Sequence, residues 1–205
     1  MRIGIMGGTF NPPHIGHLNA ATSAKERIPL DKLILIPAGI PPHKKMAENS
    51  ATVEQRLEMT RLCAESIGAE VSDVEIRREG KSFTADTLAY FREIYPDAEL
   101  WLIMGTDMFL SIEGWRRAEE ILSKACIAAV PRNDGDCESL LAHSEYLCEK
   151  YGARTKIIDV PAVEISSTEL RPDGDGEKRF EYLPKKVREY IAEHKLYCNS
   201  EEDVQ

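Results

Sequence analysis

Short runs of aliphatic residues alternate along the chain with longer stretches in which apolar residues recur at every third or fourth position. The short runs are nearly continuous in apolar residues, which is typical of strands that are covered on both faces of a sheet. Six strands are predicted in this way, at Arg2–Met6, Lys32–Pro37, Glu70–Ile76, Glu99–Met104, Cys126–Val130 and Thr155–Val160.

The longer stretches predict helices. The clearest helix start is at Thr52, because Gln55 follows three residues later and the pair can form a capping box. Another helix carries Leu140 and Leu147 on one stripe and ends at Gly152. The predicted helices are Ile15–Arg27, Val53–Ile67, Asp86–Tyr95, Ala118–Lys124, Ser139–Tyr151 and Leu183–Lys195.

This alternation of strands and helices predicts an α/β fold with a doubly wound, mostly parallel sheet. We expect one domain over residues 1–197, whose last part, about 166–197, is helical. Residues 198–205 are polar and acidic, and we expect them to form a flexible tail. Open parallel sheets bind ligands beyond the carboxyl ends of their strands, so the loops after the first, second, fourth and sixth strands are where chemistry is expected.

The composition fits an ordinary globular protein: of the 205 residues, 42% are hydrophobic and 30% are charged. A net charge of −9 argues against non-specific nucleic-acid binding, although a local cationic pocket can still accept small anions. The five cysteines include no C-x-x-C pair, which favours reduced thiols. With no signal peptide and no long apolar run, we expect a cytoplasmic protein without membrane partners, and its oligomeric state stays open.

The loop after the first strand carries the most informative chemistry. Gly7 and Gly8 allow a tight turn and a close approach to a ligand, and the following helix start offers backbone N–H groups to phosphate. His14 and His17 are three residues apart and can face the same anion. Packing alone also explains a glycine-rich turn, and two histidines can bind a metal, but no acidic or cysteine partner stands beside them. Neither a dinucleotide fingerprint nor a P-loop is present.

Residues 7 to 17 read G-G-T-F-N-P-P-H-I-G-H and resemble the H-x-G-H superfamily of nucleotidyltransferases in its adenylyltransferase version. Residues 165 to 171 read I-S-S-T-E-L-R and resemble the second signature of that superfamily, although alone they also suit a helix N-cap. The resemblance implies a Rossmann-like nucleotidyltransferase fold, with His14 and His17 as the catalytic residues. It also implies ATP and phosphate contacts from Gly7, Gly8, Thr9, Phe10, Ile165, Ser166, Ser167, Thr168 and Arg171.

Three further segments resemble bacterial nicotinate mononucleotide adenylyltransferases. They are S-F-T-A-D-T-L at Ser82–Leu88, G-T-D at Gly105–Asp107 with Trp115 eight residues after the aspartate, and P-P-H-K at Pro41–Lys44. The resemblance spans residues 1 to about 197. It implies transfer of an adenylyl group from ATP to nicotinate mononucleotide, giving nicotinate adenine dinucleotide and pyrophosphate, in NAD biosynthesis.

The resemblance also divides the remaining site residues between the two substrates. Gly105 and Asp107 are expected to contact ATP, because a carboxylate accepts well from ribose hydroxyls; the alternative is that Asp107 caps the turn after it. Trp115 is expected to support the pyridine ring, and the alternative is a core anchor. The residues expected to bind nicotinate mononucleotide are His43, Lys44, Thr84, Trp115 and Arg132.

No resident metal site is expected, and Mg²⁺ should arrive on the ATP, bound by phosphates and waters. The rival interpretations are another enzyme of the superfamily, such as a phosphopantetheine adenylyltransferase or a cytidylyltransferase, and a non-catalytic nucleotide-binding module. The Ser82–Leu88 segment and Trp115 speak against the first rival. The presence of both His14 and His17 speaks against the second, because a binding module has no need of donors to a transition state.

Overall fold

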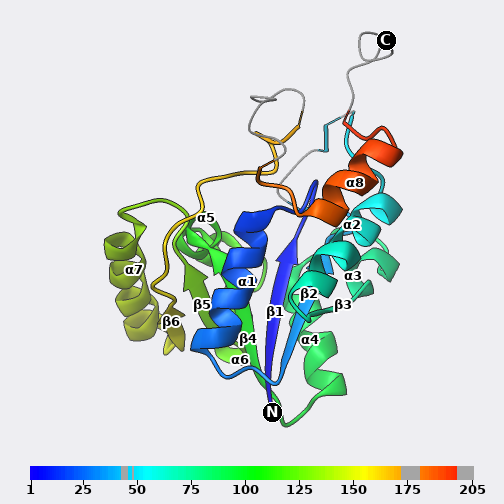
Figure 1. The fold of residues 1–205 in the computed structure, drawn as a ribbon. Helices are drawn as coiled ribbons and strands as arrows, with labels where there is room; N and C mark the ends of the chain where they lie inside the picture. The colour runs from blue at the N-terminus through cyan, green and yellow to red at the C-terminus, as the bar shows by residue number, and fades with distance from the viewer. Residues whose placement is uncertain (43–45, 48, 172–180, 198–205) are drawn as a thin grey trace.

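The computed structural model describes residues 1–42, 46, 47, 49–171 and 181–197. Within these residues a six-stranded sheet has the order β3-β2-β1-β4-β5-β6, and every neighbouring pair is parallel (Figure 1). This arrangement confirms the predicted α/β class with a doubly wound sheet. The strands are β1 Arg2–Gly8, β2 Lys32–Pro37, β3 Glu70–Val71, β4 Glu99–Gly105, β5 Cys126–Val130 and β6 Thr155–Ile157.

The helices follow the strands in alternation, as the pattern predicted. The bounds of α1, α6, β2 and β5 agree with the predicted ones, and the predicted capping box opens α2, with Thr52 and Gln55 bonding to each other's backbone. The helices are α1 Ile15–Arg27, α2 Val53–Ser66, α3 Val74–Arg77, α4 Thr84–Ile94, α5 Thr106–Leu110, the 3₁₀ turn η1 Ile112–Gly114, α6 Ala118–Lys124, α7 Asp136–Tyr151 and α8 Lys185–Glu193.

Successive strand residues face opposite layers of the molecule. In β1, Ile5 packs in a cluster with Leu88 of α4 and Ile121 of α6, whereas the next residue, Met6, packs with Ala21 of α1. Both faces of the sheet are therefore covered, which is why the strands contain so few polar residues. In Figure 1, α1 lies over one face of the sheet, beside β1 and on the side of β4.

A third apolar cluster joins the C-terminal part to α2. Val187 and Ile191 of α8 pack with Met59 of α2, and Ile165 and Leu170 belong to the same cluster. This packing holds the Ile165–Leu170 segment above the carboxyl ends of the strands, where Figure 1 shows α8 lying against α2. The predicted tail at 198–205 lies outside the described residues.

The predicted strand Glu70–Ile76 is wrong beyond Val71. The N–H of Ser72 still donates to the carbonyl of Leu35, but the chain then turns into the four-residue helix α3. Val71 and Val74 are three residues apart, and this spacing suits a helix as well as a strand. Helix α5 and the turn η1 were not among the predicted helices. Other differences are at element ends: β1 and β4 run on to Gly8 and Gly105, β6 stops at Ile157, α8 is shorter than predicted, and α4 and α7 begin at Thr84 and Asp136. Within the described residues, no helix has the length and apolar character needed to span a membrane.

Candidate active site

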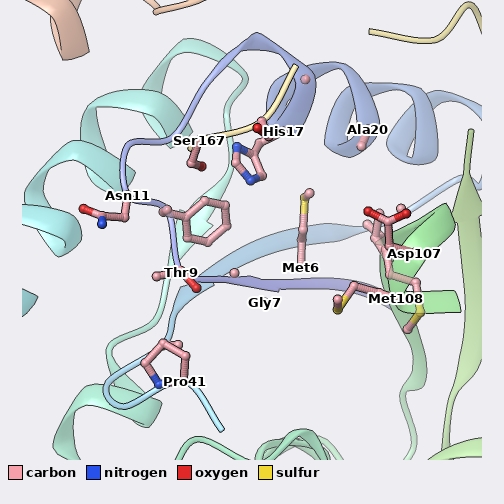
Figure 2. A pocket seen from close by; sticks show the side chains of 18 of the residues that line it. Met6, Gly7, Thr9, Asn11, His17, Ala20, Pro41, Asp107, Met108 and Ser167 are labelled. Carbon is pink, nitrogen blue, oxygen red and sulfur yellow. The ribbon is translucent and has the colours of Figure 1, made fainter. Parts of the chain in front are cut away.

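A cavity of about 360 Å³ opens at the carboxyl ends of β1 and β4, where the strand order changes direction. Open α/β sheets bind their ligands at such a switch point. Every predicted site residue in the described part of the chain lines this one cavity, whereas His43 and Lys44 lie outside the described residues. Figure 2 shows the ring of His17 in this space, with Asp107 and Met108 on the opposite side and Pro41 beyond Thr9.

The two histidines are held together at the start of α1. His14 is the N-cap residue, and its backbone N–H donates to Nδ1 of His17 over 3.2 Å. The ring centroids are 3.8 Å apart, and the ring of Phe10 stands edge-on to His17 at 4.9 Å. Because Nδ1 of His17 accepts a hydrogen bond, a neutral His17 carries its proton on Nε2. The site thus contains a positioned N–H donor, of the kind that binds a phosphate oxygen.

His14 differs from His17 in its surroundings. It is 5% exposed, and burial, followed by the neighbouring His17 and Arg132, holds the pKa of His14 well below the ordinary histidine value. His14 is therefore neutral at neutral pH. Its Nδ1 lies about 3.0 Å from where a Cβ at residue 16 would stand, so Gly16 leaves the room that the His14 ring occupies.

This burial predicts a pH-dependent stability. The folded pKa of His14 is lowered, so between that pKa and the unfolded value of about 6.5 the unfolded chain binds more protons, and stability falls as the pH drops below about 6.5. The urea midpoint of His14→Gln is expected to fall less between pH 7.5 and pH 5 than that of the wild type. His194→Gln removes an exposed histidine and is the control. Equal slopes for H14Q and the wild type would contradict the assignment.

Two glycines leave space for a ligand rather than for protein atoms. A Cβ on Gly7 would meet no described atom within 4 Å, and one on Gly105 would meet only the carbonyl oxygen of Val130, at 4.0 Å. Gly8 is different, because a Cβ there would stand 3.0 Å from the ring of Phe10. Gly7 and Gly105 thus keep the backbone of β1 and β4 open to a bound molecule.

Asp107 and Arg132 form an ion pair across the mouth of the cavity. Nη1 of Arg132 is 2.5 Å from Oδ2 of Asp107, and its Nη2 donates to the carbonyl of Ile165 over 3.3 Å. The N-cap of α5 is Gly105, so the alternative interpretation of Asp107 as the cap is wrong. Arg132 was expected at the mononucleotide, and the structure places it beside two residues that were expected at ATP. From there its guanidinium can reach phosphates shared by both substrates.

The second signature bonds mainly to the protein itself. Ser166 and Glu169 bond reciprocally, with the backbone N–H of Ser166 donating to Oε2 of Glu169 over 2.8 Å, which is the capping arrangement named above as the alternative. Ser167 donates to the carbonyl of Pro12 over 2.9 Å, and Arg171 donates to the carbonyl of Asn11 over 2.9 Å. Residues 167–170 form turns rather than a helix. The segment therefore ties the C-terminal part to the first loop, and its contacts with phosphate stay a prediction.

The opposite end of the cavity is apolar and aromatic. Thr84 is the first residue of α4, where helix N–H groups and the helix dipole favour an anionic group. Trp115 is half-buried, packs against the main core cluster and lines the cavity, and its contact with the pyridine ring stays a prediction. Arg116 lies over the ring of Phe83 at 4.5 Å, which joins the Trp115 segment to the start of α4.

The sequence reasoning missed buried polar residues that fix the loops. Arg56 of α2 is 1% exposed and donates to the carbonyls of Thr9, Ala38 and Gly39 over 2.9, 2.6 and 3.0 Å. Asn11 accepts from the N–H of Ala51 and from the hydroxyl of Tyr197, over 3.2 and 2.7 Å. A signal for Arg56 does exist, because it lies on the same helical stripe as the buried Met59 and Cys63, where a charge is unusual.

Comparison with known proteins agrees with this geometry. The family model described as "Cytidylyltransferase-like" matches residues 5–172. The chain belongs to the cytidylyltransferase-like family. Among its relatives, proteins named "Probable nicotinate-nucleotide adenylyltransferase" from Lachnoclostridium phytofermentans and Desulfitobacterium hafniense strain Y51 are 38% and 40% identical. Each alignment covers 96% of this chain, and 98% and 95% of the relative respectively. The resemblance seen in the motifs is thereby confirmed.

Solved structures confirm the fold. The nicotinic acid mononucleotide adenylyltransferase of Plasmodium falciparum, complexed with NaAD, superimposes with a TM-score of 0.77 at 19% identity, over 96% of this chain and 97% of that one. A putative nicotinate-nucleotide adenylyltransferase from Vibrio parahaemolyticus gives a TM-score of 0.64 at 21% identity, over 96% of each chain. These likenesses extend over the whole sheet and its helices, so the nucleotidyltransferase fold predicted from the motifs is confirmed.

Proposed function

We propose that this protein transfers the adenylyl group of ATP to nicotinate mononucleotide, releasing pyrophosphate and forming nicotinate adenine dinucleotide in NAD biosynthesis. One observation carries the proposal: a single cavity joins a phosphate-binding end, built from the first loop and the two histidines, to an aromatic end with a helix N-terminus. The names of the relatives and the length of their alignments support the same reaction.

The reaction requires the protein to align the two substrates and to stabilise the negative charge that develops. The phosphate of the mononucleotide is already anionic, so one of its oxygens can attack the α-phosphorus of ATP without a general base, and the bond to the β-phosphate oxygen breaks. Positioning and electrostatics carry such reactions. Nε2–H of His17 is proposed to donate to the α-phosphate, while the backbone N–H of His14 holds the His17 ring and the His14 side chain orients the phosphate beside it. Arg132 is proposed to move from Asp107 to a substrate phosphate.

Mg²⁺ is proposed to enter as part of the ATP substrate, because it binds chiefly to phosphate oxygens and waters. The cavity fits a substrate that brings its own cation: Asp107 and Glu75 are its acidic lining residues among those described, and Glu75 is engaged with Thr87. Within the described residues, no group of three or more His, Cys, Asp or Glu side chains is arranged to hold a metal ion. The cytoplasmic location stays a prediction, and the oligomeric state, for which a homo-oligomer is one alternative, stays open. Cys63, Cys126, Cys137 and Cys148 are free thiols.

The test is a coupled pyrophosphate assay with ATP and either nicotinate or nicotinamide mononucleotide. Turnover of the nicotinate substrate is expected. Phosphopantetheine with ATP, and CTP in place of ATP, address the rival enzymes in the same assay. ATP binding in calorimetry without pyrophosphate release from any acceptor would instead establish a binding module and refute the proposal.

Trp115→Ala is expected to raise KM for nicotinate mononucleotide more than KM for ATP, because the substitution removes the aromatic surface at one end of the cavity. Trp115→Phe keeps an aromatic ring and is expected to lie between Ala and the wild type. Steady-state kinetics with each substrate varied in turn gives both constants. An equal rise in the two KM values would mean that Trp115 acts only through the core.

A further inference from the structure

A buried carboxyl group that no motif assigns lies at the aromatic end of the cavity. Glu75 of α3 is 6% exposed and lines the cavity. The hydroxyl of Thr87 donates to its Oε1 over 2.7 Å. Burying a carboxyl group is costly unless its hydrogen bonds are made. A buried carboxyl at the cavity wall is therefore a candidate for a role in the site.

Glu75 lies against residues on both sides of the pair that faces the cavity. Thr87, in the first turn of α4, donates to its carboxyl group, and Ser82, just before that helix, is close enough to lower the pKa of that carboxyl, against the larger effect of burial. Phe83 and Thr84 lie between these partners and line the cavity. One side chain thus holds the two ends of the turn that presents Phe83 and the first N–H groups of α4.

The same carboxyl is linked through Ser82 to the loop after β2. Oγ of Ser82 accepts from the N–H of Gly39 over 3.0 Å, and the N–H of Ser82 donates to the carbonyl of Ile40 over 2.9 Å. A Cβ on Gly39 would stand 2.6 Å from the carbonyl oxygen of Glu75, so this loop and α3 are in direct contact. The loop after β2, helix α3 and the start of α4 therefore meet around Glu75 and Ser82.

We infer that Glu75 is a positioning residue for the acceptor: it fixes Phe83 and Thr84, and with them the end of the cavity that receives the pyridine ring of the mononucleotide. This inference rests on the proposed function. The Glu75 side chain acts through Ser82 and Thr87 and not on the reacting atoms, so its effect belongs to acceptor binding. Burial raises the pKa of the Glu75 carboxyl, which favours its neutral form beside an anionic acceptor.

The test compares Glu75→Met with Thr87→Val: the first removes the acceptor oxygen and the second removes the donor hydroxyl of the bond between the two side chains. Both variants are expected to raise KM for nicotinate mononucleotide about tenfold while KM for ATP stays within about twofold, since one lost buried hydrogen bond has roughly that effect. Thr87→Ser keeps the hydroxyl and is expected to restore most of the affinity. Glu79→Gln removes an exposed glutamate nearby and is the matched control, expected to match the wild type.

The double variant E75M/T87V separates a shared role from two independent ones. If Glu75 acts through Thr87, the combined rise in KM is smaller than the product of the single rises. Equal rises in both KM values, or full additivity, would overturn the inference while the wild type still turns over the mononucleotide. No wild-type turnover would instead overturn the proposed function. If E75M does not fold, T87V against T87S decides the outcome, and equal kinetics of these two would also overturn the inference.

Discussion

His17→Ala lowers kcat by about 10²-fold or more and leaves the fold intact, if the donor at the start of α1 serves the transition state. The reason lies in its geometry. Nδ1 of His17 is engaged by the N–H of His14, and the ring lies against Phe10, so its Nε2–H is held in place before any substrate binds. A donor that is already in place lowers the free energy of the transition state most, because negative charge builds on the α-phosphate as pyrophosphate leaves. Single-turnover kinetics with saturating substrates measures the loss directly.

Two variants control this experiment. His194→Ala removes an exposed histidine of the last helical turn and is expected to keep full activity. His17→Asn retains an acceptor for the His14 N–H, so its thermal midpoint is expected to stay close to that of the wild type while kcat falls. A His17→Ala enzyme with undiminished kcat would refute the central catalytic assignment.

The fold was largely predictable because its buried strands and helices carry strong local patterns. α1, α6, β2 and β5 begin and end where predicted. The failures occur where tertiary contacts decide. Val71, Val74 and Ile76 suit either a strand or a helix, and contact between Gly39 and the Glu75 backbone accompanies the helical choice. The starts of α4 and α7 were predicted too late, because the N-cap residues Phe83 and Gly135 give no capping hydrogen bond from a side chain.

The candidate site was predictable as a set of residues but not as a set of contacts. Every described residue that was predicted for the site lines the cavity, because such motifs mark residues near a shared ligand. Their partners are less accessible to sequence reasoning. Nothing local to Arg171 shows that it bonds to the carbonyl of Asn11, 160 residues earlier, or that Arg132 pairs with Asp107. Long-range hydrogen bonds among loops leave no periodic trace, so the partners of Arg56 and Glu75 came only from the structure, although the place of Arg56 on a buried helical stripe was visible in the sequence.

Arg56→Met is expected to give the largest loss of stability of any variant considered for this protein. The guanidinium is buried and bonds to the carbonyls of Thr9, Ala38 and Gly39, so its removal leaves acceptors from two loops without donors. Each unsatisfied buried group costs about 1–3 kcal/mol, and a total of roughly 3 kcal/mol or more is expected. Methionine preserves most of the apolar stem, so the loss measures the hydrogen bonds rather than a cavity.

For a chain of this size, that loss corresponds to a fall in Tm of roughly 6–12 °C, which calorimetry or circular dichroism resolves easily. Arg61→Met is the matched control, because Arg61 lies on the same helix, is exposed and, among the described residues, forms its ion pair with Glu58 at 3.3 Å. The change in its free energy of unfolding is expected to stay within about 0.5 kcal/mol. Arg56 also joins the loops after β1 and β2. Loss of this connection in R56M should therefore weaken the binding of both substrates together. A stable R56M with an unchanged Tm would show that water replaces the guanidinium, and that the two loops hold their places through other contacts.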